Sequence, residues 1–173
     1  MNTNILIHYL LVVLFLTIDS IDKCFCVKQY PFVTCGSVLK LLNTNYNVRL
    51  HSHDVKYGSG SGQQSVTGTE TQEDVNSYWA VRGKSDKMCL RGEPVECGAV
   101  VRLQHMSTKK NLHSHHFSSP LSGNQEISAY GDQNGEGDTG DNWTVVCSGD
   151  YWERGTDVRL KHVDTEMSGI NLS

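Results

Sequence analysis

Basic residues are not in excess in this chain, proline is scarce, and the short patterns typical of enzymes are missing. The 15 lysines and arginines are outnumbered by 19 aspartates and glutamates, so the formal net charge is −4. Nucleic-acid binding requires a basic surface, and this balance gives it no support. The sequence contains no P-loop, nucleophile elbow, His-Glu-x-x-His or Cys-x-x-Cys pattern, and its acidic residues form no paired motif. We therefore expect no enzymatic activity and no cofactor.

The only long hydrophobic run lies near the N-terminus, at Ile5–Ile18. It is short for a membrane span and ends in polar residues, so we interpret 1–26 as a helical signal peptide cleaved before Val27. The alternative is an uncleaved anchor. Cleavage leaves an even number of cysteines in a chain bound for an oxidising compartment, namely Cys35, Cys89, Cys97 and Cys147. No membrane attachment is expected after cleavage.

Blocks of sequence recur about every 60 residues, which indicates a repeat architecture. The run Cys35–Leu41 and the later Leu50-His51-Ser52-His53 return 62 residues on as Cys97–Leu103 and Leu112-His113-Ser114-His115. Trp79 returns as Trp143. The sequence that begins each repeat occurs a third time at 155–162.

The repeats predict strands and an all-β fold. Each start places a basic residue between two apolar ones, as in Leu39-Lys40-Leu41, Val101-Arg102-Leu103 and Val158-Arg159-Leu160. That alternation is the period of a half-buried strand, with the apolar pair facing inward. With 3 prolines and 16 glycines, short strands joined by turns are expected, and no helix longer than one or two turns after residue 26. Three similar units favour a closed β-trefoil over a propeller, whose repeats are normally shorter.

Several of these stretches resemble the stromal cell-derived factor 2 family of MIR-domain proteins. They are Val33–Val38, Arg49–Asp54, Tyr57–Gly68, Asn111–His116, Ser119–Glu126 and Trp143–Trp152. The resemblance implies a β-trefoil of MIR repeats in the endoplasmic reticulum lumen. It implies a non-enzymatic adaptor that works with Hsp40-type and Hsp70 chaperones in quality control of misfolded or O-mannosylated proteins.

On this basis the chain divides into repeat 1 at 30–84, repeat 2 at 92–147 and a partial repeat 3 at 148–173. The family continues well beyond the equivalent of Thr165, commonly to a retention signal of the His-Asp-Glu-Leu type. Here we expect no second strand, no tryptophan and no retention signal after that point. The third lobe is therefore expected to be incomplete, and the protein to be lumenal or secreted.

The repeated positions suggest structural roles more than ligand sites. His51 and His53, like His113 and His115, form same-face pairs on strands, a spacing that can chelate a metal. No third ligand stands at a local spacing, so we interpret both pairs as packing or hydrogen-bonding groups and expect no metal. Leu50, Leu112, Trp79 and Trp143 are expected in the core, with sugar stacking the alternative for the tryptophans. Trp152 falls outside the pattern and is expected to be partly exposed.

Two further assignments concern covalent chemistry. Asn142 and Asn171 begin glycosylation sequons. We discount the first because the following Trp143 is expected to be buried, and the second because it lies near the last residue. Four cysteines allow three pairings, and the repeat positions favour Cys35–Cys89 with Cys97–Cys147, because the first and last strands of one trefoil lobe are neighbours.

Two classes of function therefore remain. The first is the lumenal adaptor, and the second is a lectin-like module whose ligand is a glycan. Only fold analogy supports the second at this stage.

Overall fold

The computed structural model describes residues 30–120, 122–166 and 168–172, and the predicted signal peptide lies outside them. The strands are β1 (Val38–Leu39), β2 (Leu42–Asn43), β3 (Val48–Lys56), β4 (Gln64–Thr69), β5 (Trp79–Gly83), β6 (Val100–His105), β7 (Asn111–Ser118), β8 (Gln125–Tyr130), β9 (Trp143–Val146), β10 (Val158–His162) and β11 (Ser168–Leu172). Single 3₁₀ turns form η2 (Val75–Ser77) and η3 (Thr139–Asp141). None of the helices in the described part is long and apolar enough to cross a membrane.

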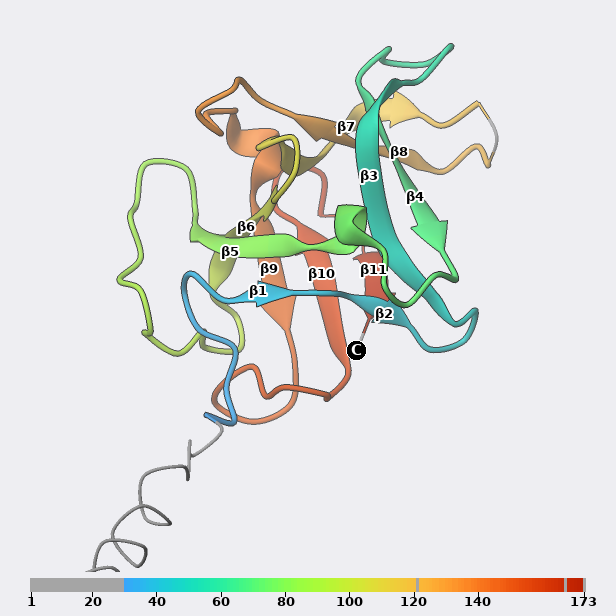
Figure 1. Cartoon of the computed structure of the whole chain (residues 1–173). Coiled ribbons are helices and arrows are strands. Elements are labelled where there is room, and N and C mark those ends of the chain that lie inside the picture. Colours follow the sequence, from blue (N-terminus) through green and yellow to red (C-terminus); the bar gives the residue numbers. More distant parts are fainter. Residues whose placement is uncertain (1–29, 121, 167, 173) are drawn as a thin grey trace, which may run out of the picture. The chain divides into compact units, whose positions relative to one another are not determined.

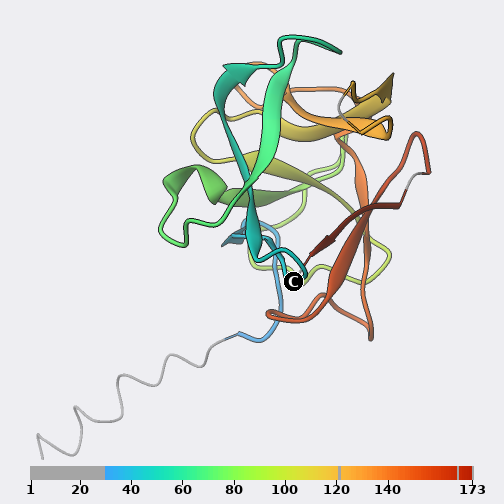
Figure 2. The same cartoon turned by 90° about the vertical axis from the view of Figure 1, so that its right-hand side faces the viewer.

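These strands form one curled sheet, as Figure 1 shows. Its order is β11-β10-β9-β6-β7-β8-β4-β3-β2, and β5 joins it by pairing with both β1 and β6. The hairpins β3–β4 and β7–β8 come from equivalent parts of repeats 1 and 2, and β4 pairs with β8 (Figure 2). The all-β prediction is confirmed.

Backbone hydrogen bonds join the segments that precede the three repeat starts into a ring. Val33 N–H donates to Trp152 O (2.8 Å), Trp152 N–H donates to Val95 O (2.8 Å), and Val95 N–H donates to Val33 O (3.0 Å). Three further bonds at equivalent positions run from Cys35 N–H to Glu93 O, from Cys97 N–H to Asp150 O and from Arg154 N–H to Pro31 O. The three repeats thus meet at equivalent residues.

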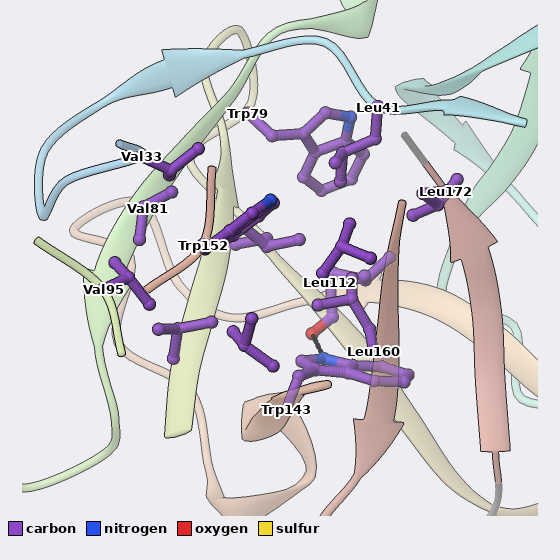
Figure 3. Packing of buried hydrophobic residues seen from close by; sticks show 14 of the residues in the cluster. Val33, Leu41, Trp79, Val81, Val95, Leu112, Trp143, Trp152, Leu160 and Leu172 are labelled. Carbon is purple, nitrogen blue, oxygen red and sulfur yellow. Dashed lines mark hydrogen bonds between the residues drawn. The ribbon is translucent and has the colours of Figure 1, made fainter. Parts of the chain in front are cut away.

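Trp152 belongs to this ring and is only 3% exposed, so the expectation that it is partly exposed is wrong. It stands 57 residues after Val95, the same offset that relates the third repeat start to the second. When the three repeats are aligned, Trp152 therefore occupies the same position, or column, as Val33 and Val95. Its indole lies among the core side chains (Figure 3).

The inward residues of the repeat starts form the core, as predicted. Leu41, Val101, Leu103, Val158 and Leu160 are buried, and Leu39 packs against them. Trp79 and Trp143 are fully buried, and each indole N–H donates to a backbone carbonyl of the preceding hairpin, Leu50 O (3.0 Å) and Leu112 O (2.8 Å; Figure 3). Their burial leaves no free ring face for stacking on a sugar.

The third repeat extends further than expected. β10 pairs with β9 on one side and with β11 on the other. The expectation of no second strand after Thr165 is therefore wrong. The β10–β11 register places Leu172 opposite Val158, and Leu172 joins the core at 5% exposure.

Two disulfides close the first two repeats. Cys35 is bonded to Cys89 and Cys97 to Cys147, with Cα–Cα distances of 5.9 and 5.3 Å. These are the pairs that the repeat positions favour. Each bond joins the start of a repeat to the segment after its tryptophan strand.

Two buried histidines predict a dependence of stability on pH. His105 stacks on Trp79 and His162 on Trp143, at ring separations of 5.0 and 4.9 Å. Each Nε2–H donates to a backbone carbonyl and each Nδ1 accepts from a threonine hydroxyl, so the neutral form is satisfied. Burial is the main cause that lowers the pKa of both side chains.

Because the folded pKa is lowered, the unfolded chain takes up protons that the folded chain does not once the pH falls below about 6.5. We expect the free energy of unfolding to fall with pH in that range by up to about 1.4 kcal/mol per pH unit for each histidine. Denaturant titrations between pH 7.5 and 5 measure this fall in the free energy of unfolding. Asp74, with its lowered pKa, stays ionised over that range. Asn43 stands at the position of repeat 1 that is equivalent to His105, so asparagine fits this place in the repeat. His105→Asn should therefore reduce the slope of the unfolding free energy against pH by the contribution of about one proton. An unchanged slope would contradict the assignment.

Candidate functional site

The polar positions that the sequence singled out lie on the outward faces of the hairpins β3–β4 and β7–β8. On β3, His51 Nδ1 donates to Asp74 Oδ2 (2.7 Å), and His51 Nε2 accepts from Nδ1 of His53 (2.9 Å). Asp74 precedes η2, and Ser77 at the end of that turn donates to the same carboxylate. The structure therefore links the two histidines to a carboxylate that lies 23 residues further along the chain.

The chemistry of this cluster is that of a fixed hydrogen-bonded network. Burial by itself would raise the pKa of Asp74, but hydrogen bonds from Ser77, His51 and the Asn76 backbone outweigh it, and the pKa is lowered. Ser77 Oγ donates to the carboxylate and not to a histidine nitrogen. Among the described residues no histidine nitrogen accepts from this hydroxyl, so the cluster lacks the serine–histidine order of a catalytic triad.

Repeat 2 carries the equivalent cluster with a second carboxylate. His113 Nδ1 donates to Asp141 Oδ1 (3.0 Å) and lies 3.5 Å from Asp138 Oδ1. Asp141 is the last residue of η3, and Asp138 caps that turn by accepting from Gly140 N–H (2.9 Å). His113, Asp138 and Asp141 bring potential ligand atoms within 4.8 Å of one another and are the described residues that could hold a metal. The sequence search missed this group because the carboxylates are not at a local spacing.

The two repeats also meet through a buried carboxylate. Glu126 on β8 is 3% exposed and accepts from His115 Nε2 (3.3 Å) and from Ser61 Oγ. Ser61 lies in the glycine-rich loop of repeat 1, so the contact fixes that loop against the neighbouring hairpin. Burial, with a contribution from Glu126, raises the pKa of nearby Tyr57.

A row of four rings distinguishes repeat 2 from repeat 1. Along the outward face of β7–β8, Tyr130 lies 4.9 Å from His113, His113 lies 5.4 Å from His115, and His115 lies 4.8 Å from Phe117. Tyr130 and Phe117 are 39% and 58% exposed. Repeat 1 has Thr69 and Val55 at these columns, so the aromatic ends of the row are not needed for the shared framework.

The two predicted sequons are placed differently. Asn142 is 8% exposed and its Oδ1 accepts from Ser85 N–H (2.9 Å), so the folded chain does not present this amide for glycosylation. Only the backbone of Asn171 is described, in β11. The expectation that Asn171 is not glycosylated stays untested.

Residues 40–146 match the MIR domain family. The chain is 65% identical to human stromal cell-derived factor 2 over 135 residues, which cover 78% of this chain and 64% of that protein. The chain belongs to this family. It thus spans just under two thirds of the human family member.

Solved structures agree with this membership of the stromal cell-derived factor 2 family. The crystal structure of the SDF2-like protein from Arabidopsis thaliana matches with a TM-score of 0.74 and 50% identity, covering 78% of this chain and 75% of that one. The Saccharomyces cerevisiae protein O-mannosyltransferase Pmt1–Pmt2 complex, solved with its sugar donor, matches with a TM-score of 0.69 and 29% identity. That match covers 80% of this chain but 20% of the yeast chain.

Proposed function

We propose that the protein is a non-enzymatic MIR-domain adaptor of the endoplasmic reticulum lumen that assists chaperone-based quality control. Family membership carries the proposal. Two disulfides support an oxidising compartment such as this lumen or the secretory route. The match to stromal cell-derived factor 2, a MIR-domain protein whose name is not that of an enzyme, supports a non-enzymatic role. Hsp40-type and Hsp70 chaperones are the proposed partners, and misfolded or O-mannosylated proteins are the proposed clients.

We also propose that the three repeats, 30–84, 92–147 and the portion at 148–173, are lobes of a β-trefoil. The backbone ring of Val33, Val95 and Trp152 and the three further bonds at equivalent positions relate all three repeats, which supports threefold organisation. The ring contacts of Trp79 with His105 and of Trp143 with His162, each a histidine of the next repeat, support it further.

Binding of purified chaperones tests the adaptor function. The whole chain, after any signal cleavage, is immobilised and exposed to an Hsp40-type cochaperone of the lumen, with and without Hsp70 and ATP. We expect a saturable complex with the cochaperone. Absence of that complex would refute the proposal, and so would mannosyl transfer from a lipid-linked donor by the purified chain.

A second candidate function is glycan binding at the ring row of repeat 2. Exposed aromatic rings beside hydrogen-bonding groups suit a sugar ring, and the row Tyr130–His113–His115–Phe117 offers both. A screen of mannose-containing glycans tests it. We expect the double substitution Phe117→Ala, Tyr130→Ala to weaken binding by about tenfold, because it removes both exposed rings. The same change at the matching positions of repeat 1, Val55→Ala with Thr69→Ala, should leave binding unchanged.

A further inference from the structure

Repeat 1 contains a loop that repeat 2 lacks. The segment from Trp79 to Cys89 is six residues longer than the equivalent segment from Trp143 to Cys147. The additional residues leave the sheet at the end of β5 and form the long connection toward β6 (Figure 1). Since the shared framework forms without them in repeat 2, their retention in repeat 1 calls for a separate explanation.

The loop is anchored at both ends. Cys89 is bonded to Cys35, and Ser85 donates from its N–H to Asn142 Oδ1 (2.9 Å) and from its hydroxyl to Asp138 O (3.0 Å). Between these anchors the chain folds back on Gly83, where an added Cβ would lie 2.1 Å from Lys87 O. The loop therefore holds a defined path.

That path presents large apolar side chains to solvent. Met88 is 91% exposed and Leu90 74% exposed, on either side of the disulfide-bonded Cys89. The Cys35–Cys89 bond anchors the backbone between these two side chains. Methionine is unbranched and polarizable, and it adapts to partners of different shape.

The same loop forms one wall of a hollow of about 500 Å³. Val95 and Val101, both buried, lie at its base, and Pro94, Ala99 and Val100 line it further. Met88 and the lysines Lys84 and Lys87 line it from the loop side. Glu93 and Glu96 also line the hollow, so its lining combines apolar side chains, two lysines on the loop side and two carboxylates on the segment that follows the loop.

The two lysines are available for a partner. In residues 30–120, 122–166 and 168–172, every ion pair involves a histidine, so neither Lys84 nor Lys87 has a carboxylate at pairing distance. A bound segment with a carboxylate next to its apolar residues could pair with these lysines while its apolar residues contact the apolar side chains of the loop and the hollow.

We propose that Lys84, Lys87, Met88 and Leu90, together with the hollow beside them, bind an extended apolar segment of a non-native client chain that carries an adjacent carboxylate. The inference rests on the proposed adaptor function for the source of the segment. An unfolded chain exposes such segments, whereas a folded partner buries most of its own. The pliable methionine and the open hollow suit segments of varied sequence.

Fluorescence anisotropy with a labelled peptide tests this surface in the whole chain. The probe alternates leucine and serine and carries aspartate at both ends, and a second version carries lysine instead. We expect the acidic peptide to bind more tightly, and Met88→Ser with Leu90→Ser to weaken it by about tenfold. Lys84→Ala with Lys87→Ala should abolish the preference between the two peptides.

Tyr46→Ser with Val75→Ser is the matched control, because these side chains are 76% and 68% exposed and do not line the hollow. Equal weakening by the control and by the Met88/Leu90 variant would overturn the proposal. So would a dimer in sedimentation that is lost in the Met88/Leu90 variant, which would assign the surface to a second copy. If the chain captures the purified cochaperone but not the peptide, the proposed client-binding surface is refuted and the adaptor function is not.

Discussion

Replacing Trp79 by alanine is expected to lower the free energy of unfolding by about 3–5 kcal/mol. The indole is fully buried, so its removal leaves a large cavity and withdraws apolar surface from the core. It also removes the hydrogen bond from Nε1 to Leu50 O and the stacking partner of His105. Since domains are stable by about 5–15 kcal/mol, this single change removes a large part of the total. Urea denaturation followed by circular dichroism measures the loss.

The matched substitution Trp79→Phe separates the contribution of the buried ring from that of the indole N–H hydrogen bond. It keeps an aromatic ring against His105 but loses the indole N–H, so its cost should be clearly smaller than that of alanine. If alanine costs less than about 1 kcal/mol, a value typical of a surface change, then Trp79 is not the core residue described here.

The strand starts and the main core could be predicted from the sequence because they follow a local rule. A basic residue between two apolar ones follows the two-residue period of a half-buried strand. The repetition identifies β6 at Val101–Leu103 and β10 at Val158–Leu160 without any knowledge of tertiary contacts. At Leu39–Leu41 the predicted strand is interrupted, because β1 ends at Leu39 and β2 begins at Leu42, although both leucines still pack in the core as predicted. The two disulfides follow from the same repeat logic, because equivalent strands place equivalent cysteines together.

Other features were missed because they depend on tertiary contacts. Trp152 has valines in its column in the other repeats, so a comparison of tryptophans alone does not place it in the core. The carboxylates of Asp74 and Asp141 reach their histidines across 23 and 28 residues, beyond any spacing that a local motif records. The strand β11 joins the sheet by pairing with β10.

Removing either disulfide by a double cysteine-to-alanine substitution is expected to cost about 4 kcal/mol of stability in the chain-entropy model. The closed loops are similar, with sequence separations of 54 for Cys35–Cys89 and 50 for Cys97–Cys147, so the two costs should be similar. Alanine is preferred to serine because Cys35 is buried at 6% exposure, and a hydroxyl there would lack a partner. Guanidinium midpoints of both variants, measured against the oxidised parent, give the values.

The two variants should differ in a second measurement. Only Cys89 lies between Met88 and Leu90, so loss of the Cys35–Cys89 bond frees the loop that carries the proposed docking surface, whereas loss of Cys97–Cys147 leaves that loop anchored. Under conditions where both variants remain folded, peptide binding should weaken in the Cys35→Ala, Cys89→Ala variant and stay near the parent value in the other. A similar loss of binding in both variants would mean that binding follows overall stability. A loss of binding confined to the Cys35→Ala, Cys89→Ala variant would mean that binding depends on the fixed path of the loop.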